Sequence, residues 1–198
     1  MAIQVFGDSI SGNCLKVKWV CDVLNIPCRW EEVDILNGES RVPAFLAMNP
    51  AGQVPVVILE DGRALAQSNA IAMYLAEGSR LIPADRYGRA KVSEWLFWEQ
   101  YRHEPYIAVA RFQVVYQHRT FAELEPKLVE RGHAALSRLE AATGESAFLV
   151  GEALSLADIA LVAYTRMAGQ GGFDLNAYPA VRSWIGRVEG ELRLDPLV

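Results

Sequence analysis

Short apolar runs alternate with a segment of helical periodicity at the start of the chain. Residues 3–6 form an apolar-rich run, and a loop of small and polar residues follows it. In residues 13–24 the apolar positions recur at helical spacing, which predicts a helix, and Pro27 lies beyond its end. Residues 28–34 mix tryptophan and valine with charged residues and suit a second strand. The opening therefore predicts a β-α-β unit with parallel strands and a right-handed crossover.

The same alternation continues through the next part of the chain. The pattern predicts a short helix at residues 43–48 and a last helix at residues 70–75. Between them it predicts two strands, at residues 54–59 and 63–66, that are joined by a turn. Ser68 is the predicted N-cap of the last of these helices. Residues 1–77 therefore predict one mixed α/β domain with the element order β-α-β-α-β-β-α.

Strand signals disappear in the second half of the chain. Residues 78–86 contain Gly78, Pro83 and several charged residues, and this composition suits a linker. Helical periodicity then marks residues 87–116, 123–142, 156–167 and 178–188. Pro105 lacks a backbone donor and is expected to kink the first of these helices. We therefore predict a second domain at residues 87–198 that is an all-helical bundle.

Composition and charge narrow the function classes. The chain has 198 residues, of which 52% are hydrophobic and 22% charged, and its net charge is −5. Lysine and arginine are scattered, which disfavours nucleic acid and anionic membrane surfaces as partners. Apolar runs stay below the ~18 residues of a membrane span, and the start of the chain lacks the pattern of a secretory signal. We therefore expect a cytoplasmic protein without membrane contact.

The three cysteines, Cys14, Cys21 and Cys28, are spaced seven residues apart. This spacing matches neither a redox pair of the CxxC type nor a zinc site. Free thiols in a reducing compartment are the simplest interpretation, and no metal is expected.

The loop at residues 9–14 is the first candidate for chemistry. It lies between a predicted strand end and a helix start, where free backbone donors and the helix dipole favour an anion such as a thiolate. Ser11 is placed to donate its hydroxyl to such an anion. The alternative is that Ser11 or Asn13 simply caps the helix.

Two further segments could bind an extended ligand. Proline is unusual at the opening of a central-looking strand, because it cannot donate to the ladder. A cis Pro55 would turn the backbone of Val54 outward for pairing, whereas a plain edge-strand proline would have no such role. Gln67 and Ser68 precede a helix and could bind a carboxylate through hydroxyl, amide and backbone N–H groups. An ordinary helix cap is the alternative there.

Taken together, these segments resemble the glutathione transferase family in order and spacing. The specific elements are Gln53-Val54-Pro55 and the run Ala66-Gln67-Ser68-Asn69-Ala70-Ile71. Other stretches that look like bacterial members are 11–17, 33–41, 46–50, 155–160 and 178–181. The resemblance covers nearly the whole chain.

This resemblance implies a thioredoxin-like first domain that binds glutathione as co-substrate and a helical domain that receives a small electrophile. It implies that Val54 pairs its backbone with the cysteinyl unit beside a cis Pro55, and that Gln67 and Ser68 hold the γ-glutamyl end. Gln53, and more loosely Arg41, would lie towards the glycyl carboxylate. The resemblance also implies a homodimer.

The resemblance defines less closely the residue that activates the sulfur of glutathione. Phe6 stands where other members carry a tyrosine, so the serine-type arrangement with Ser11 fits better, and Asn13, Cys14 and Ser9 are alternatives. Cys14 could form a mixed disulfide with glutathione, which would indicate a peroxidase or disulfide reductase. It could equally be a buried helix residue. A non-catalytic binding or interaction protein on the same fold is a further alternative.

In the helical domain, aromatic residues recur near helical spacing along residues 95–109, which is most often a packing pattern. Tyr106 and Arg111 are the candidates for lining the electrophile pocket. Ser155 and Asp158 form a pattern close to a capping box and are predicted to act structurally.

Overall fold

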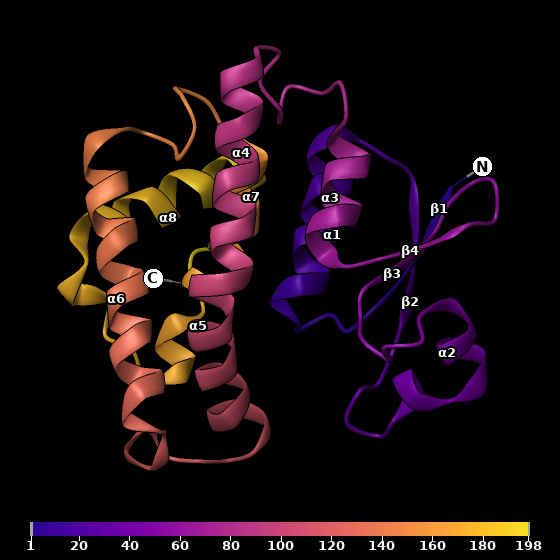
Figure 1. Cartoon of the computed structure of the whole chain (residues 1–198), viewed down its shortest axis with the longest axis horizontal. Helices are drawn as coiled ribbons and strands as arrows, with labels where there is room; N and C mark the ends of the chain where they lie inside the picture. Colours follow the sequence, from indigo (N-terminus) through magenta and orange to yellow (C-terminus); the bar gives the residue numbers. More distant parts are fainter. Residues whose placement is uncertain (1, 198) are drawn as a thin grey trace. The chain divides into compact units, whose positions relative to one another are not determined.

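The computed structural model describes residues 2–197. The chain divides into two compact units, one up to Ser79 and one from Arg80 onward, and each is described by itself (Figure 1). Within the described residues, none of the helices is long and apolar enough to cross a membrane.

A four-stranded mixed sheet forms the centre of the first unit. Its strands are β1 (Ile3–Gly7), β2 (Cys28–Glu32), β3 (Val56–Ile58) and β4 (Ala64–Ala66), in the spatial order β2-β1-β3-β4. The pair β1–β2 is parallel, as the β-α-β pattern predicted, whereas β1–β3 and β3–β4 are antiparallel.

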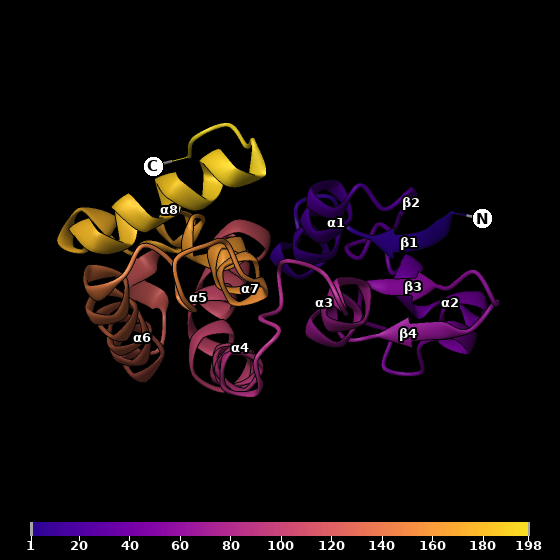
Figure 2. The ribbon, with the colours of Figure 1, turned by 90° about the horizontal axis from the view of Figure 1, so that it is seen from above.

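Helices cover both faces of this sheet. α1 (Gly12–Leu24) and α3 (Ser68–Ala76) lie side by side on one face, and α2 (Pro43–Met48), which follows the short helix η1 (Glu39–Arg41), lies on the other (Figure 2). The core under α1 and α3 consists of Ile3, Val5, Val17, Cys21, Val57, Leu59 and Ile71, and a smaller core contains Val33, Phe45 and Val56. The predicted element order is confirmed, and the unit is a thioredoxin-like domain.

The second unit is entirely helical among its described residues. Its elements are α4 (Arg86–Trp98), η2 (Glu99–His103), α5 (Glu104–Arg111), η3 (Phe112–Tyr116), η4 (Phe121–Glu123), α6 (Pro126–Glu145), α7 (Leu156–Thr165), η5 (Ala168–Gly171), η6 (Leu175–Ala177) and α8 (Pro179–Leu192). All ten residues of α7 are buried, so this helix is the core of the bundle.

The first helix of this unit differs from the simple kinked helix that was predicted. The stretch is α-helical in α4, π-helical in η2, α-helical in α5 and π-helical again in η3. Pro105 lies in the first turn of α5. A backbone N–H at that position has no acceptor within the helix, so its absence in proline costs little. The irregular backbone therefore lies in the turn before the proline.

Candidate active site

One end of the sheet brings the candidate segments of the first unit together. The strand register aligns Phe6 of β1 with Val56 of β3, and Val56 with Ala66 of β4. The loop after β1, the segment before β3 and the residue after β4 therefore emerge at the same end. These are the three segments that carry Ser11, Val54-Pro55 and Gln67-Ser68.

Ser11 occupies the N-cap position of α1 with extended backbone angles. Among the described residues its side chain makes no capping hydrogen bond, so the capping alternative is not what the hydroxyl does in this structure. Its backbone N–H donates to the Asp8 carbonyl over 3.1 Å. The hydroxyl lies within hydrogen-bonding reach of the Cys14 sulfur. Ser11 thus carries a donor at a helix N-terminus, where the dipole favours negative charge.

Cys14 is packed beneath this loop. It is fully buried, and its sulfur accepts a hydrogen bond from the Asp8 N–H at 3.4 Å. Gly7 makes room for it, because a Cβ there would lie 2.9 Å from the Trp30 ring and 3.1 Å from the Cys14 Cβ. Burial raises the pKa of the Cys14 thiol to about 12, although Asp8 and Ser11 donors oppose this. The thiol is therefore protonated at neutral pH and out of reach of solvent.

Asn13 connects the starts of α1 and α3. Its Oδ1 accepts hydrogen bonds from the Ser68 hydroxyl at 2.9 Å and from Lys16 Nζ at 2.8 Å. Lys16 itself is fully buried, and the sequence patterns did not single it out. These bonds hold the two helix N-termini beside each other, so Asn13 acts as a connector between the two candidate segments.

Ser9 lies at the exposed edge of the same loop. Its backbone N–H donates to Glu32 Oε1 over 2.8 Å, and the Trp30 indole donates to the other oxygen of that carboxylate over 2.7 Å. Burial raises the pKa of Glu32, but these hydrogen bonds outweigh it and leave the pKa below its usual value. An ionised Glu32 therefore holds the loop against β2.

The predicted N-cap of α3 was wrong by one residue. The N-cap is Gln67, and Ser68 is the first residue of the helix. Gln67 has φ +74° and ψ 113°. Residues other than glycine rarely adopt this backbone conformation, and such residues cluster at functional sites. Gln67 is exposed, whereas Ser68 is buried.

The segment before β3 contains a cis peptide bond between Val54 and Pro55, as the resemblance implied. Asn49 Nδ2 donates to the Gln53 carbonyl over 2.7 Å. Arg41 Nη1 donates to the Ala51 carbonyl over 3.0 Å. The Arg41 guanidinium lies against Gly52, which has φ +62° and would bring an added Cβ within 2.5 Å of Nη1. The Arg41 guanidinium therefore lies beside the stretch of chain that leads to Gln53.

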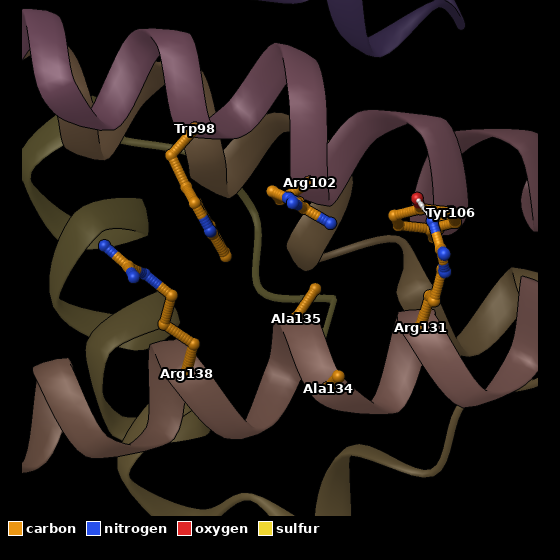
Figure 3. A pocket seen from close by; sticks show the side chains of 7 residues that line it. All are labelled: Trp98, Arg102, Tyr106, Arg131, Ala134, Ala135 and Arg138. Carbon is orange, nitrogen blue, oxygen red and sulfur yellow. Dashed lines mark hydrogen bonds between the residues drawn. The ribbon is translucent and has the colours of Figure 1, made fainter.

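In the second unit, Tyr106 lines a pocket of about 140 Å³. The pocket lies between α6 and the helical stretch that runs from α4 to α5 (Figure 3). The residues that line it are Trp98, Arg102, Tyr106, Arg131, Ala134, Ala135 and Arg138. The Tyr106 hydroxyl accepts a hydrogen bond from Arg131 Nη1 at 2.6 Å. The spacing of Arg131 and Arg138 by seven residues on one predicted helix was a signal that sequence reasoning missed.

Arg111 lies elsewhere in the same unit. It is buried, and its Nε donates to Gln170 Oε1 over 2.7 Å. A Cβ at Gly171 would lie 2.9 Å from the Arg111 backbone nitrogen, so α5 and η5 pack closely there. Arg111 is therefore not among the residues that line the Tyr106 pocket described above. Within residues 2–197, no group of three histidine, cysteine, aspartate or glutamate side chains could hold a metal ion.

Comparison with known proteins agrees with this architecture. The family description of the glutathione S-transferase N-terminal domain matches residues 10–77, and that of the C-terminal domain matches residues 102–191. A glutathione S-transferase from Pseudomonas fluorescens has a solved structure that is 46% identical, covers 100% of both chains and superposes with a TM-score of 0.94.

Two further relatives extend the comparison. A possible glutathione S-transferase from Rhodopseudomonas palustris is 40% identical, with coverage of 100% of this chain and 98% of that chain and a TM-score of 0.92. A probable glutathione S-transferase of Oryza sativa subsp. japonica is 30% identical and covers 92% of this chain and 89% of its own. The chain therefore belongs to the glutathione S-transferase family.

Proposed function

We propose that the protein is a glutathione transferase that activates the thiol of bound glutathione for attack on small hydrophobic electrophiles. The observation that carries this proposal is the placement of Ser11. Its hydroxyl stands at the N-terminus of α1 without capping that helix, at the sheet end where the cis Val54–Pro55 bond and Gln67 also lie.

The remaining contacts follow the extended shape of glutathione. The backbone of Val54 pairs with the cysteinyl unit, and the N-terminus of α3 at Gln67 and Ser68 receives the γ-glutamyl carboxylate. Arg41 and Gln53 lie towards the glycyl carboxylate. Because these segments emerge at the same end of the sheet, we assign the glutathione sulfur to the neighbourhood of the loop that carries Ser11.

Activation is electrostatic. The thiolate is the nucleophile, whereas a cysteine thiol with a pKa of about 8.5 is mostly protonated at neutral pH. A hydrogen bond to the charged sulfur and the helix N-terminus together contribute about 2–4 kcal/mol. Since one pKa unit corresponds to about 1.4 kcal/mol, the bound thiol should ionise roughly 1.5–3 units below free glutathione.

The surroundings of Cys14 weigh against the peroxidase or reductase alternative. That chemistry requires an accessible thiolate, whereas the Cys14 thiol is buried with a pKa of about 12. For the non-catalytic alternative, we note that protein URE2 of Candida albicans, whose name states no enzymatic activity, is 26% identical over 91% of this chain and 64% of its own. Catalysis must therefore be tested directly.

Other parts of the proposal come from the family. We assign the electrophile to the helical unit, with Tyr106 as the leading contact and Arg111 as the second candidate. A homodimer and a cytoplasmic location are further parts of the proposal. A screen of electrophilic substrates identifies the natural electrophile and tests whether the role is detoxification.

The decisive experiment is an ultraviolet titration of the thiolate of glutathione bound to the purified protein across pH. The thiolate should appear roughly 1.5–3 pH units below that of free glutathione. Ser11→Ala should raise the apparent pKa of the bound thiol by roughly 1–2 units and lower kcat/KM about 10–100-fold, since it removes a donor worth about 1.5–3 kcal/mol.

Ser9→Ala and Asn13→Ala are the matched comparisons in the same loop, and both should keep the low pKa. A shift of the pKa in one of these variants and not in Ser11→Ala would assign the activation to that residue. Glutathione that binds with an unchanged pKa would contradict thiolate activation, and no binding would contradict the transferase assignment.

A further inference from the structure

Two cysteines lie together at the other end of the sheet from the candidate active site. Cys21 is in the last turns of α1, and Cys28 is the first residue of β2. The chain folds back between them, with the Ile26 N–H donating to the Cys21 carbonyl over 2.9 Å. Cys28 is aligned with Ile3 at the start of β1, whereas the loop carrying Ser11 follows the end of that strand.

The two side chains share one environment. Cys21 belongs to the core under α1 and α3, and Cys28 packs against the same cluster. Cys28 lies near enough to Cys21 for its thiol to contribute to the raised pKa of Cys21. Thiols that lie beside each other in one cluster can form a disulfide where the backbone brings their Cα atoms within about 7 Å.

The two thiols differ in their access to solvent. Cys21 is only 1% exposed, and burial, reinforced by the neighbouring Cys28, raises its pKa to about 12. Cys28 is partly exposed, so a small oxidant can reach its sulfur. Since susceptibility to oxidation follows exposure and thiolate character, the reaction should begin at Cys28 and end at Cys21.

We propose that Cys21 and Cys28 are an oxidation site that forms a reversible intramolecular disulfide with hydrogen peroxide as the oxidant. The Cys28 thiolate attacks one peroxide oxygen, the O–O bond breaks, and Cys28 becomes a sulfenic acid as hydroxide leaves. The Cys21 sulfur then attacks the sulfenic sulfur, the S–O bond breaks, and the Cys21 proton leaves with the hydroxyl group as water. Two molecules of glutathione can reduce the disulfide by thiol exchange and become glutathione disulfide.

This site does not depend on the proposed transferase function. The pair lies at the opposite end of β1 from Ser11, and Cys14, the third cysteine, is buried with a pKa of about 12. Cys14 should therefore stay reduced under the same conditions, and it serves as an internal reference in the same chain.

The test is mass spectrometry of the folded wild-type chain after brief exposure to hydrogen peroxide, acid quenching and alkylation under denaturing conditions. The untreated chain should carry alkyl groups on all three cysteines, and the oxidised chain on Cys14 alone. Trypsin cleaves after Lys18 and Arg29 and so places both oxidised cysteines in one peptide. Cleavage before Asp22 then separates them, so that only a disulfide keeps the two pieces together.

Glutathione should restore three alkylated positions, and Ser11→Ala should give the same result as the wild-type chain. Cys28→Ala should leave Cys21 alkylatable after peroxide, since Cys21 is shielded. The proposal is overturned if all three cysteines stay alkylatable, if Cys28 ends as a sulfinic acid beside an alkylatable Cys21, or if the link involves Cys14 or a second chain. The three outcomes that would overturn the proposal are all measured on the wild-type protein, so a variant that folds poorly does not decide the result.

Discussion

Ser11 and Cys14 belong to the same loop, yet their surroundings suit them to different tasks. Ser11 is a partly exposed hydroxyl at a helix N-terminus, and Cys14 is a fully buried thiol beneath it. Sequence position alone left both open as activators. The pKa of a thiol depends on its burial. The burial of Cys14 is set by tertiary packing, in which Gly7 leaves room beside Trp30 and Cys14. Local sequence patterns do not encode such packing.

We predict that Cys14→Ala keeps the proposed conjugating activity. The substitution removes a buried sulfur that carries no charge at neutral pH, so kcat/KM with an activated aryl halide should stay within about threefold of the wild-type value, while stability falls by on the order of 1 kcal/mol. Steady-state kinetics beside Ser11→Ala provide the comparison. A loss in Cys14→Ala as large as in Ser11→Ala would assign the chemistry to the thiol.

Gln67 and Ser68 show where residue-level prediction stops. The motif identified both positions, but it placed the N-cap on Ser68 because serine is a common cap. In the structure the cap is Gln67 with a positive φ, and the Ser68 hydroxyl donates to Asn13, 55 positions away in sequence. A long-range bond and a rare backbone conformation have no local signal, so the sequence could predict the segment and not its geometry.

At the scale of elements, α7 depends on one buried carboxylate at its start. Asp158 accepts hydrogen bonds from the Leu149 and Ser155 backbone N–H groups, the Ser155 hydroxyl and the Trp184 indole, over 2.6–2.9 Å. The predicted pattern of Ser155 and Asp158 is confirmed as a capping box. The carboxylate also anchors α8 through Trp184 and the preceding loop through Leu149, which the motif did not predict.

We predict that Asp158→Ala lowers the free energy of unfolding by about 3–5 kcal/mol. The change leaves buried donors without an acceptor, and each such group costs about 1–3 kcal/mol. Denaturant unfolding followed by circular dichroism measures the loss. Asp174→Ala is the matched control, because Asp174 caps the short helix η6 at an exposed position, and it should cost only about 1 kcal/mol. Equal losses in the two variants would contradict the anchoring role.

The long helix before α6 marks the limit of periodicity at this scale. Apolar spacing predicted one helix with a kink at Pro105, whereas the structure has π-helical turns at η2 and η3. A π-turn adds about one residue to a helical turn, but the segments before and after it each keep the helical spacing of their apolar positions. The presence of the helix was therefore predictable, and its interruptions were not.

At the scale of the whole molecule, the change from mixed α/β to all-helical patterning was the strongest signal in the sequence. It arises because strands repeat every two residues and helices every 3.6, so the two kinds of core require different sequences. The strand order β2-β1-β3-β4 was not predicted, since the antiparallel pairing of β1 with β3 depends on tertiary contacts. All proposed glutathione contacts fall within the first unit.

Glutathione should therefore stabilise the folded chain, and Gln67 should decide how strongly. At a concentration 100 times its Kd, a ligand that binds only the folded state adds about 2.7 kcal/mol, which for 198 residues corresponds to a rise in Tm of roughly 5–11 °C. Gln67→Gly is a suitable variant, because glycine accepts the positive φ of this position without a steric cost. Without ligand its Tm should equal or exceed that of the wild-type chain.

With glutathione present, Gln67→Gly should lose most of the rise in Tm, since the amide that holds the γ-glutamyl end is gone. Ser11→Ala should keep most of the rise at a pH below the ionisation of the bound thiol, because its hydroxyl acts on the thiolate and not on the rest of the tripeptide. Differential scanning calorimetry at one protein concentration measures both shifts. An undiminished rise in Gln67→Gly would place the γ-glutamyl end elsewhere and would leave the proposed role of Ser11 unaffected.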